Sequence, residues 1–238
     1  MACECLSYIA CILLCYVIIL IISRWLAQRE GTSGPDGNAD TPDSPNGGDE
    51  ADGPSDGNLL RNNCGQDGLK YWTVMSNQGD GWLVENKPVG CDPLPSVDAD
   101  GNPVRDFGGR TSCFATSSRL CMMEQVIDLV LSGFSREELD KKQPPIEISE
   151  WYAGHSECGS TYLMNVTLLD ENKQNVCHYK AERILSKNAG QWKKVTQKFS
   201  KYGPGIRYVS FNHAGSCSED KPGHYGCKMT GGIVRVMK

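Results

Sequence analysis

The chain has 238 residues, 39% hydrophobic and 22% charged, which suits one globular domain of ordinary size with further segments attached. Its net charge of −5 comes from residues 31–57, where seven acids stand without Lys or Arg, and residues 58–238 carry +2. A domain so close to neutral lacks the clustered basic face that phosphate contacts need, so nucleic acid is excluded as a partner.

The first segment, residues 1–29, is predicted to anchor the chain in a membrane. Leu6 to Ile22 is an uncharged apolar run followed by Arg24 and Trp25, and in lipid such a run is expected to form a hydrophobic helix. A cleaved secretory signal is the alternative, but the residues before the run hold no Lys or Arg. The sequence therefore predicts a single-pass membrane protein, and the arginines after the run favour a cytosolic domain.

Residues 30–57 are predicted to be a linker. The segment is rich in Gly, Pro and acidic residues, and its apolar residues are two alanines. Such a composition cannot bury enough apolar surface to offset the chain entropy of folding. We expect a disordered, acidic tether.

From residue 58 to residue 238 the sequence has the pattern of a β-sandwich. Seven apolar runs have the length of strands: Trp72 to Met75, Trp82 to Val84, Tyr162 to Leu169, Val176 to Leu185, Trp192 to Phe199, Ile206 to Phe211 and Ile233 to Met237. Most of them are separated by turn residues, such as those of Gly203-Pro204-Gly205. The predicted fold class is therefore mainly β, with antiparallel strands.

Two α-helices are predicted between these strands. One is a helical stripe of apolar residues that ends at Gly133: Leu120, Met123, Ile127, Val130 and Leu131. The other begins at Ser135, whose spacing from Glu138 is that of a capping box, and must stop before Pro144.

The cysteines and histidines of the domain do not indicate a metal or an active site. Eight cysteines without paired spacing favour reduced thiols, although an even number would allow disulfides. His213, Cys217, His224 and Cys227 hold the side chains of a zinc site, but their spacing is not a known pattern. We expect no metal or other cofactor, and the absence of a nucleophile elbow or phosphate loop argues against an enzyme.

The segment 91–113 is a candidate binding surface. It has more than twenty residues without a clear secondary-structure pattern, a length typical of functional or disordered loops. Its second half contains Val104, Arg105, Phe107 and Arg110, a composition typical of binding hot spots. An insertion without function is the alternative.

Five stretches of the domain carry a resemblance to a known family. In chain order they are NLLRNNCGQDGLKYW, FATSSRLCMMEQVIDL, LDKKQPPIEISEWYAG, YGPGIRYVSFNHAG and GHYGCKMTGGIV. They resemble the F-box-associated (FBA) domain, the substrate-reading module of glycoprotein-binding F-box proteins. The resemblance implies an antiparallel, galactose-binding-like jelly roll with two helices, and ubiquitin-ligase components as partners.

Two departures from the family pattern bear on function. The predicted anchor and linker stand where the family carries its F-box. Where sugar-binding members carry Tyr-Trp-Lys in one loop, this chain has Asp220, Lys221 and Pro222. These three residues retain one cation but lack the two aromatic rings of Tyr and Trp. Because sugar recognition depends on aromatic stacking, chitobiose or high-mannose binding is not expected there. These three residues, with Arg119 and the segment 104–110, are the candidate ligand-binding loops.

Three functions remain open at this point. The chain resembles the branch of the family without an F-box, the receptor proteins of non-specific cytotoxic cells in bony fish. That resemblance implies a non-catalytic plasma-membrane receptor that binds a target-cell antigen in innate cytotoxic immunity. The alternative is a cytosol-facing substrate-recognition module for proteins and glycoproteins in the ubiquitin-ligase and ER-associated degradation pathway. The third is a scaffold domain without a ligand of its own.

Overall fold

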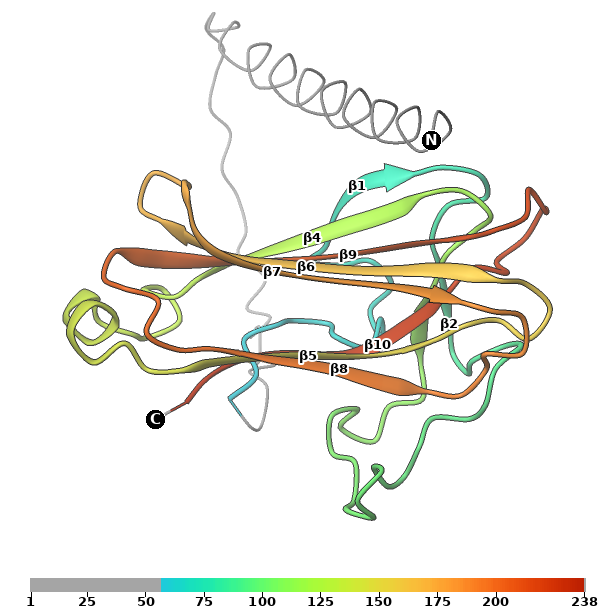
Figure 1. Cartoon of the computed structure of the whole chain (residues 1–238), viewed down its shortest axis with the longest axis horizontal. Helices are drawn as coiled ribbons and strands as arrows, with labels where there is room; N and C mark the ends of the chain where they lie inside the picture. Colours follow the sequence, from blue (N-terminus) through green and yellow to red (C-terminus); the bar gives the residue numbers. More distant parts are fainter. Residues whose placement is uncertain (1–56, 238) are drawn as a thin grey trace, which may run out of the picture. The chain divides into compact units, whose positions relative to one another are not determined.

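The computed structural model describes residues 57–237, which form two five-stranded antiparallel sheets packed face to face (Figure 1). The first sheet has the order β1 (Thr73–Asn77), β4 (Cys121–Asp128), β9 (Ile206–Cys217), β6 (Ser160–Asp170), β7 (Asn175–Leu185). The second has the order β2 (Leu83–Glu85), β3 (Cys113–Ala115), β10 (Lys228–Val236), β5 (Ile146–Ala153), β8 (Lys193–Phe199). The predicted antiparallel β-sandwich is confirmed.

The core lies between the two sheets because one face of each strand is apolar. In β6 the residues Tyr162, Met164 and Val166 are fully buried, while the side chains between them are more exposed. Across the core, the ring of Tyr152 in β5 stacks on Tyr162 with centroids 4.3 Å apart. Each large apolar side chain buried in this way stabilises the fold by roughly 1.5–3 kcal/mol.

A polar network crosses the same core. The carboxylate of Glu150 in β5 accepts a hydrogen bond from the Tyr162 hydroxyl at 2.8 Å and contacts His213 Nδ1 of β9 at 2.6 Å. The ring of Trp72 stacks on His213 with centroids 4.5 Å apart. Because an unpaired buried carboxylate would cost several kcal/mol, these contacts fix how the two sheets face each other.

The first predicted helix is wrong, because residues 121–128 form strand β4. Cys121, Met123 and Ile127 are buried on one face of this strand. Their positions fit the alternation of a strand as well as the helical stripe read from the sequence. Residues 121–128 form a strand and not a helix because β9 pairs with them along their whole length, from Cys121 opposite Gly215 to Asp128 opposite Tyr208.

The second predicted helix is also wrong as an α-helix. The chain makes a single wide turn, η1 (Glu138–Lys142), a π-helix. The hydroxyl of Ser135 accepts a hydrogen bond from the Glu138 amide at 3.1 Å, as its place in the capping box predicted. Gln143 then takes a left-handed conformation, with φ of 48°, and ends the turn before Pro144.

Within residues 57–237, no helix has the length and apolar character that crossing a membrane requires. The predicted anchor, residues 1–29 with the run from Leu6 to Ile22, lies outside the described residues. So does the predicted linker, except for Gly57.

Candidate ligand-binding loops

Four loops, here called the loop cluster, make contact with one another at one end of the sandwich. They are residues 78–82, 116–120, 154–159 and 218–227. Arg119 Nη2 donates to Asp220 Oδ2 at 3.1 Å, which joins the second loop to the fourth. Lys221 Nζ donates to Glu157 Oε2 at 3.0 Å, which joins the fourth loop to the third. The structure therefore brings together three of the predicted site residues, Arg119, Asp220 and Lys221.

Two further contacts hold the fourth loop. The amide of Gly223 donates to Asp80 Oδ2 at 2.5 Å, which adds the first loop to the loop cluster. Lys187, in the connection between β7 and β8, forms an ion pair with Glu219 at 2.6 Å. Every residue from 219 to 221 is thus held by a partner from another part of the chain.

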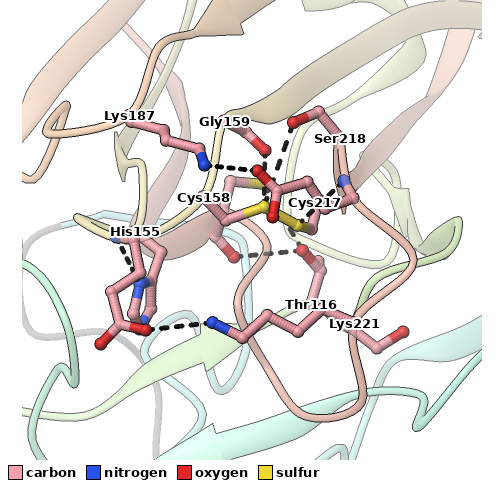
Figure 2. Close-up of a disulfide and its surroundings, with 12 residues drawn as sticks. Thr116, His155, Cys158, Gly159, Lys187, Cys217, Ser218 and Lys221 are labelled. Carbon is pink, nitrogen blue, oxygen red and sulfur yellow. Dashed lines mark hydrogen bonds and ion pairs between the residues drawn. A yellow bond between two sulfur atoms is a disulfide. The ribbon is translucent and has the colours of Figure 1, made fainter.

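A disulfide lies at the base of the loop cluster. Cys158 and Cys217 are joined across a sequence separation of 59, with their Cα atoms 6.2 Å apart (Figure 2). The pairing follows from sheet register, because Ser160 of β6 lies opposite Cys217 of β9. The amide of Ser218 donates to the Gly159 carbonyl at 2.7 Å beside it. The prediction that the domain thiols are all reduced is wrong for this pair.

The exposed ion pairs give the loop cluster a surface of alternating charge. The hydrogen bond from Arg119 lowers the pKa of Asp220, and that from Lys221 lowers the pKa of Glu157. Both carboxylates are therefore charged at neutral pH. Because the side chains of Arg119 and Asp220 are 61% and 74% exposed, such a pair stabilises the fold little, and a bound partner can exchange its own charges with it.

Tyr225, an aromatic side chain of the fourth loop, is already in contact with its neighbours. Lys221 Nζ lies 3.7 Å from the ring centroid, and the ring of His155 packs edge-on with centroids 4.8 Å apart. Burial, as the largest cause, lowers the pKa of His155, so its imidazole is neutral at pH 7. A sugar stacking on Tyr225 would have to displace the Lys221 ammonium from that ring.

A buried ion pair supports the fourth loop from below. Lys228, fully buried at the start of β10, donates from Nζ to Glu85 Oε1 at 2.5 Å and to the His224 carbonyl at 2.9 Å. Beside it, a Cβ on Gly226 would lie 2.1 Å from Thr116 Oγ1, so only glycine fits. The path of residues 224–228 is therefore fixed by charge and by close packing.

The other predicted site residues lie on the segment between β2 and β3. Val104 and Arg105 line a groove of about 830 Å³ on the outer face of the second sheet. Phe107 is 6% exposed and packs on Trp151 with ring centroids 5.7 Å apart. Its ring fixes the segment to the sheet and offers no face to a ligand. Arg110 is half-buried.

Two of the four side chains of the zinc pattern are engaged elsewhere. Cys217 is bonded to Cys158, and His213 contacts Glu150 in the core. Within residues 57–237, no group of three or more His, Cys, Asp or Glu side chains is placed to hold a metal ion.

The described residues form a β-sandwich with charged, exposed loops at one end. The chain belongs to the F-box associated region family, whose model matches residues 51–236. F-box only protein 2 of Bos taurus is 32% identical over 182 residues, which cover 75% of this chain and 58% of that protein. F-box only protein 27 of Mus musculus is 36% identical over 183 residues, covering 75% and 60%. The chain thus spans about three fifths of the length of these relatives.

Among solved structures, the carbohydrate-binding module TmCBM61 in complex with β-1,4-galactotriose has a TM-score of 0.44 at 11% identity. The match covers 75% of this chain and 98% of that one.

The relatives correct the predicted localisation. The run from Leu6 to Ile22 led to the prediction of a single-pass plasma-membrane protein, and this is contradicted by relatives that are F-box only proteins. The same relatives give no support to a target-cell antigen or to a membrane as partners.

Proposed function

We propose that this chain is a substrate-recognition module of the ubiquitin-ligase pathway, which binds proteins, glycoproteins among them, through the loop cluster. The observation that carries the proposal is the loop cluster itself: four loops held in one arrangement, on a chain of the F-box associated region family. The F-box only relatives make ubiquitin-ligase components the expected partners. This is recognition without catalysis, as expected from the sequence.

The chemistry of the loop cluster favours a polypeptide surface as the ligand. Arg119, Asp220, Lys221 and Glu157 present alternating charges at exposed positions. Complementary charges at an interface select the partner and speed association more than they add affinity. The loops gain selectivity because the disulfide and the buried Lys228 limit how far they can move.

Stacking on a sugar has a smaller part in this proposal. Lys221 lies over the ring of Tyr225, and the residues aligned with the sugar-stacking positions of the family, Asp220 to Pro222, include no aromatic ring. A glycoprotein would therefore be bound mainly through its polypeptide. The cell-surface receptor function expected from the sequence has no support among the F-box only relatives.

A charge swap tests the proposal without removing the ion pair that orders the loops. In R119D/D220R the pair persists with its polarity reversed, so the loops stay joined while the surface they present changes. The matched control is R136E/E171R, because Arg136 and Glu171 form an equally exposed pair at 3.0 Å elsewhere on the domain. The full-length wild-type chain and the two double variants are each used to capture partners. Mass spectrometry quantifies the captured partners and their ubiquitylation.

We expect the swap at 119 and 220 to abolish capture of most partners, and the control swap to leave capture unchanged. Equal capture by both variants would refute the proposal. Ribonuclease B with and without its glycan serves as the glycoprotein probe. Retention that depends on the glycan, and that millimolar chitobiose competes, would replace polypeptide recognition by sugar binding.

A further inference from the structure

The Cys158–Cys217 disulfide connects two of the ligand-binding loops (Figure 2). Cys158 belongs to the third loop, residues 154–159, and Cys217 immediately precedes the fourth, residues 218–227. Beside the bond, the Ser218 amide donates to the Gly159 carbonyl at 2.7 Å. The covalent link therefore lies where these two loops approach each other most closely in the backbone.

The constraint from this bond falls on the loops more than on the sheet. β6 and β9 are paired along their length in a ladder that begins with Ser160 opposite Cys217, so their register does not depend on the disulfide. Lys221 and Glu157 also join the third and fourth loops, but their side chains are 36% and 62% exposed. Such an ion pair holds its partners weakly. The disulfide is thus the strongest of these links between the two loops.

Breaking the bond forces the two sulfur atoms apart. Bonded sulfurs lie well inside the contact distance of unbonded heavy atoms, about 3.5–4.0 Å, and two free thiols must move out to that distance. Cys158 is 0% and Cys217 is 6% exposed, so a rotated thiol meets packed neighbours. A Cβ on Gly159 would lie 2.9 Å from Ser218 Oγ, which leaves little spare room between the loops.

The separation is expected to displace the third loop from the fourth. Cys217 is fixed in the sheet, and its amide donates to the Ser117 carbonyl at 3.1 Å. The displacement therefore falls on the third loop. It stretches the hydrogen bond that the Gly159 carbonyl accepts beyond the usual range of about 2.7–3.2 Å, and it draws Glu157 away from Lys221.

We propose that this disulfide is a redox switch of the loop cluster. A dithiol reductant reaches it beside Ser218, which is exposed. One thiolate of the reductant attacks a sulfur of the bond, and the second thiol then displaces the resulting mixed disulfide. Two electrons and two protons pass to the chain, which gains the thiols of Cys158 and Cys217, while the dithiol becomes a cyclic disulfide. Glutathione disulfide reverses the step and leaves as two glutathione thiols.

The consequence for recognition rests on the proposed function. In the oxidised chain the third and fourth loops are held together and present the charges of Arg119, Asp220, Lys221 and Glu157 in one arrangement. In the reduced chain these loops separate, and a partner must order them again as it binds, which lowers its affinity. The oxidised chain is therefore the form that captures partners.

Amide exchange measured by NMR on the full-length chain tests the switch without a partner. After reduction with dithiothreitol, the Ser218 amide should exchange at least about tenfold faster, because its hydrogen bond to the third loop opens. The Val130 amide, which donates to Asp128 Oδ1 at 2.9 Å in the turn after β4, is the control and should keep its rate. Glutathione disulfide should restore slow exchange at Ser218.

Three results of this experiment would overturn the switch. One is equal exchange of Ser218 in the two redox states. Another is an equal acceleration at Val130, which would make the effect one of global stability. The third is alkylation of Cys158 and Cys217 in the denatured chain before any reductant is added, since the bond would then be absent.

Partner capture by the oxidised and the reduced chain measures the functional consequence. Reduction should lower capture severalfold, C158S/C217S should capture weakly with or without reductant, and Cys177→Ser should behave as the wild type. Capture that R119D/D220R abolishes but reduction leaves unchanged would overturn the switch and leave the proposed function standing. Capture that the charge swap leaves unchanged would refute the proposed function, and exchange at Ser218 alone would then decide the switch.

Discussion

Replacing Cys158 and Cys217 by serine removes the covalent link between the loop before β6 and the end of β9. The bond closes a segment with a sequence separation of 59. At that length, the loop-closure entropy removed from the unfolded chain corresponds to about 4 kcal/mol at 25 °C. Since disulfides often deliver less than this value, we expect C158S/C217S to lower the free energy of unfolding by about 2–4 kcal/mol.

Urea unfolding followed by tryptophan fluorescence measures this change. The wild-type chain should lose stability when dithiothreitol is added, and C158S/C217S should show the lower stability with or without the reductant. Cys177→Ser is the matched control, because Cys177 is half-buried and unpaired. Its midpoint should fall only under reduction, as in the wild type.

A wild-type midpoint that does not respond to dithiothreitol would refute the reasoning, because the bond would then contribute nothing to stability. An equal loss of stability in Cys177→Ser without reductant would also refute it, since the loss would then come from placing serine in the core and not from removing the disulfide.

Three further predictions concern charge. Lys228→Met leaves the Glu85 carboxylate buried without its cation and should cost about 3–5 kcal/mol in urea unfolding, with much of the loss recovered in K228M/E85L; no loss would show that the pair is solvated. Arg207 holds the pKa of Asp140 at about 2, below its usual 3.8. The stability this pair contributes is therefore complete above pH 4 and is lost as the pH falls through about 2. Asp140→Asn should remove that part of the acid transition, and an unchanged pH profile would contradict the assignment. Arg119→Ala should leave the urea midpoint nearly unchanged, because its ion pair is exposed, yet reduce partner capture, and the opposite pattern would make Arg119 a structural residue.

The strands were predictable from sequence where local pattern and tertiary pairing agree. Val176 to Leu185 was expected as a strand and forms β7, because a turn at 170–174 returns it along β6. Residues 121–128 were mistaken for a helix, because their apolar positions fit both periods. The choice between the two is made by β9, a strand that lies about eighty residues further along the chain.

The loop cluster was only partly predictable, because its contacts join distant parts of the chain. Lys221 and Glu157 are 64 residues apart, and Gly223 and Asp80 are 143 apart. No local spacing encodes such contacts. The sequence pointed to residues 220–222 only through the family resemblance. The disulfide was missed for the same reason, since its pairing depends on the register of β6 and β9.

Hydrogen–deuterium exchange of the full-length chain, alone and with a captured partner, tests the central claim most directly. The partner should slow amide exchange in residues 116–120 and 218–227, the loops that carry Arg119 and Asp220. Slower exchange confined to residues 95–106, or no change in any loop at the Cys158–Cys217 end of the sandwich, would contradict recognition through the loop cluster.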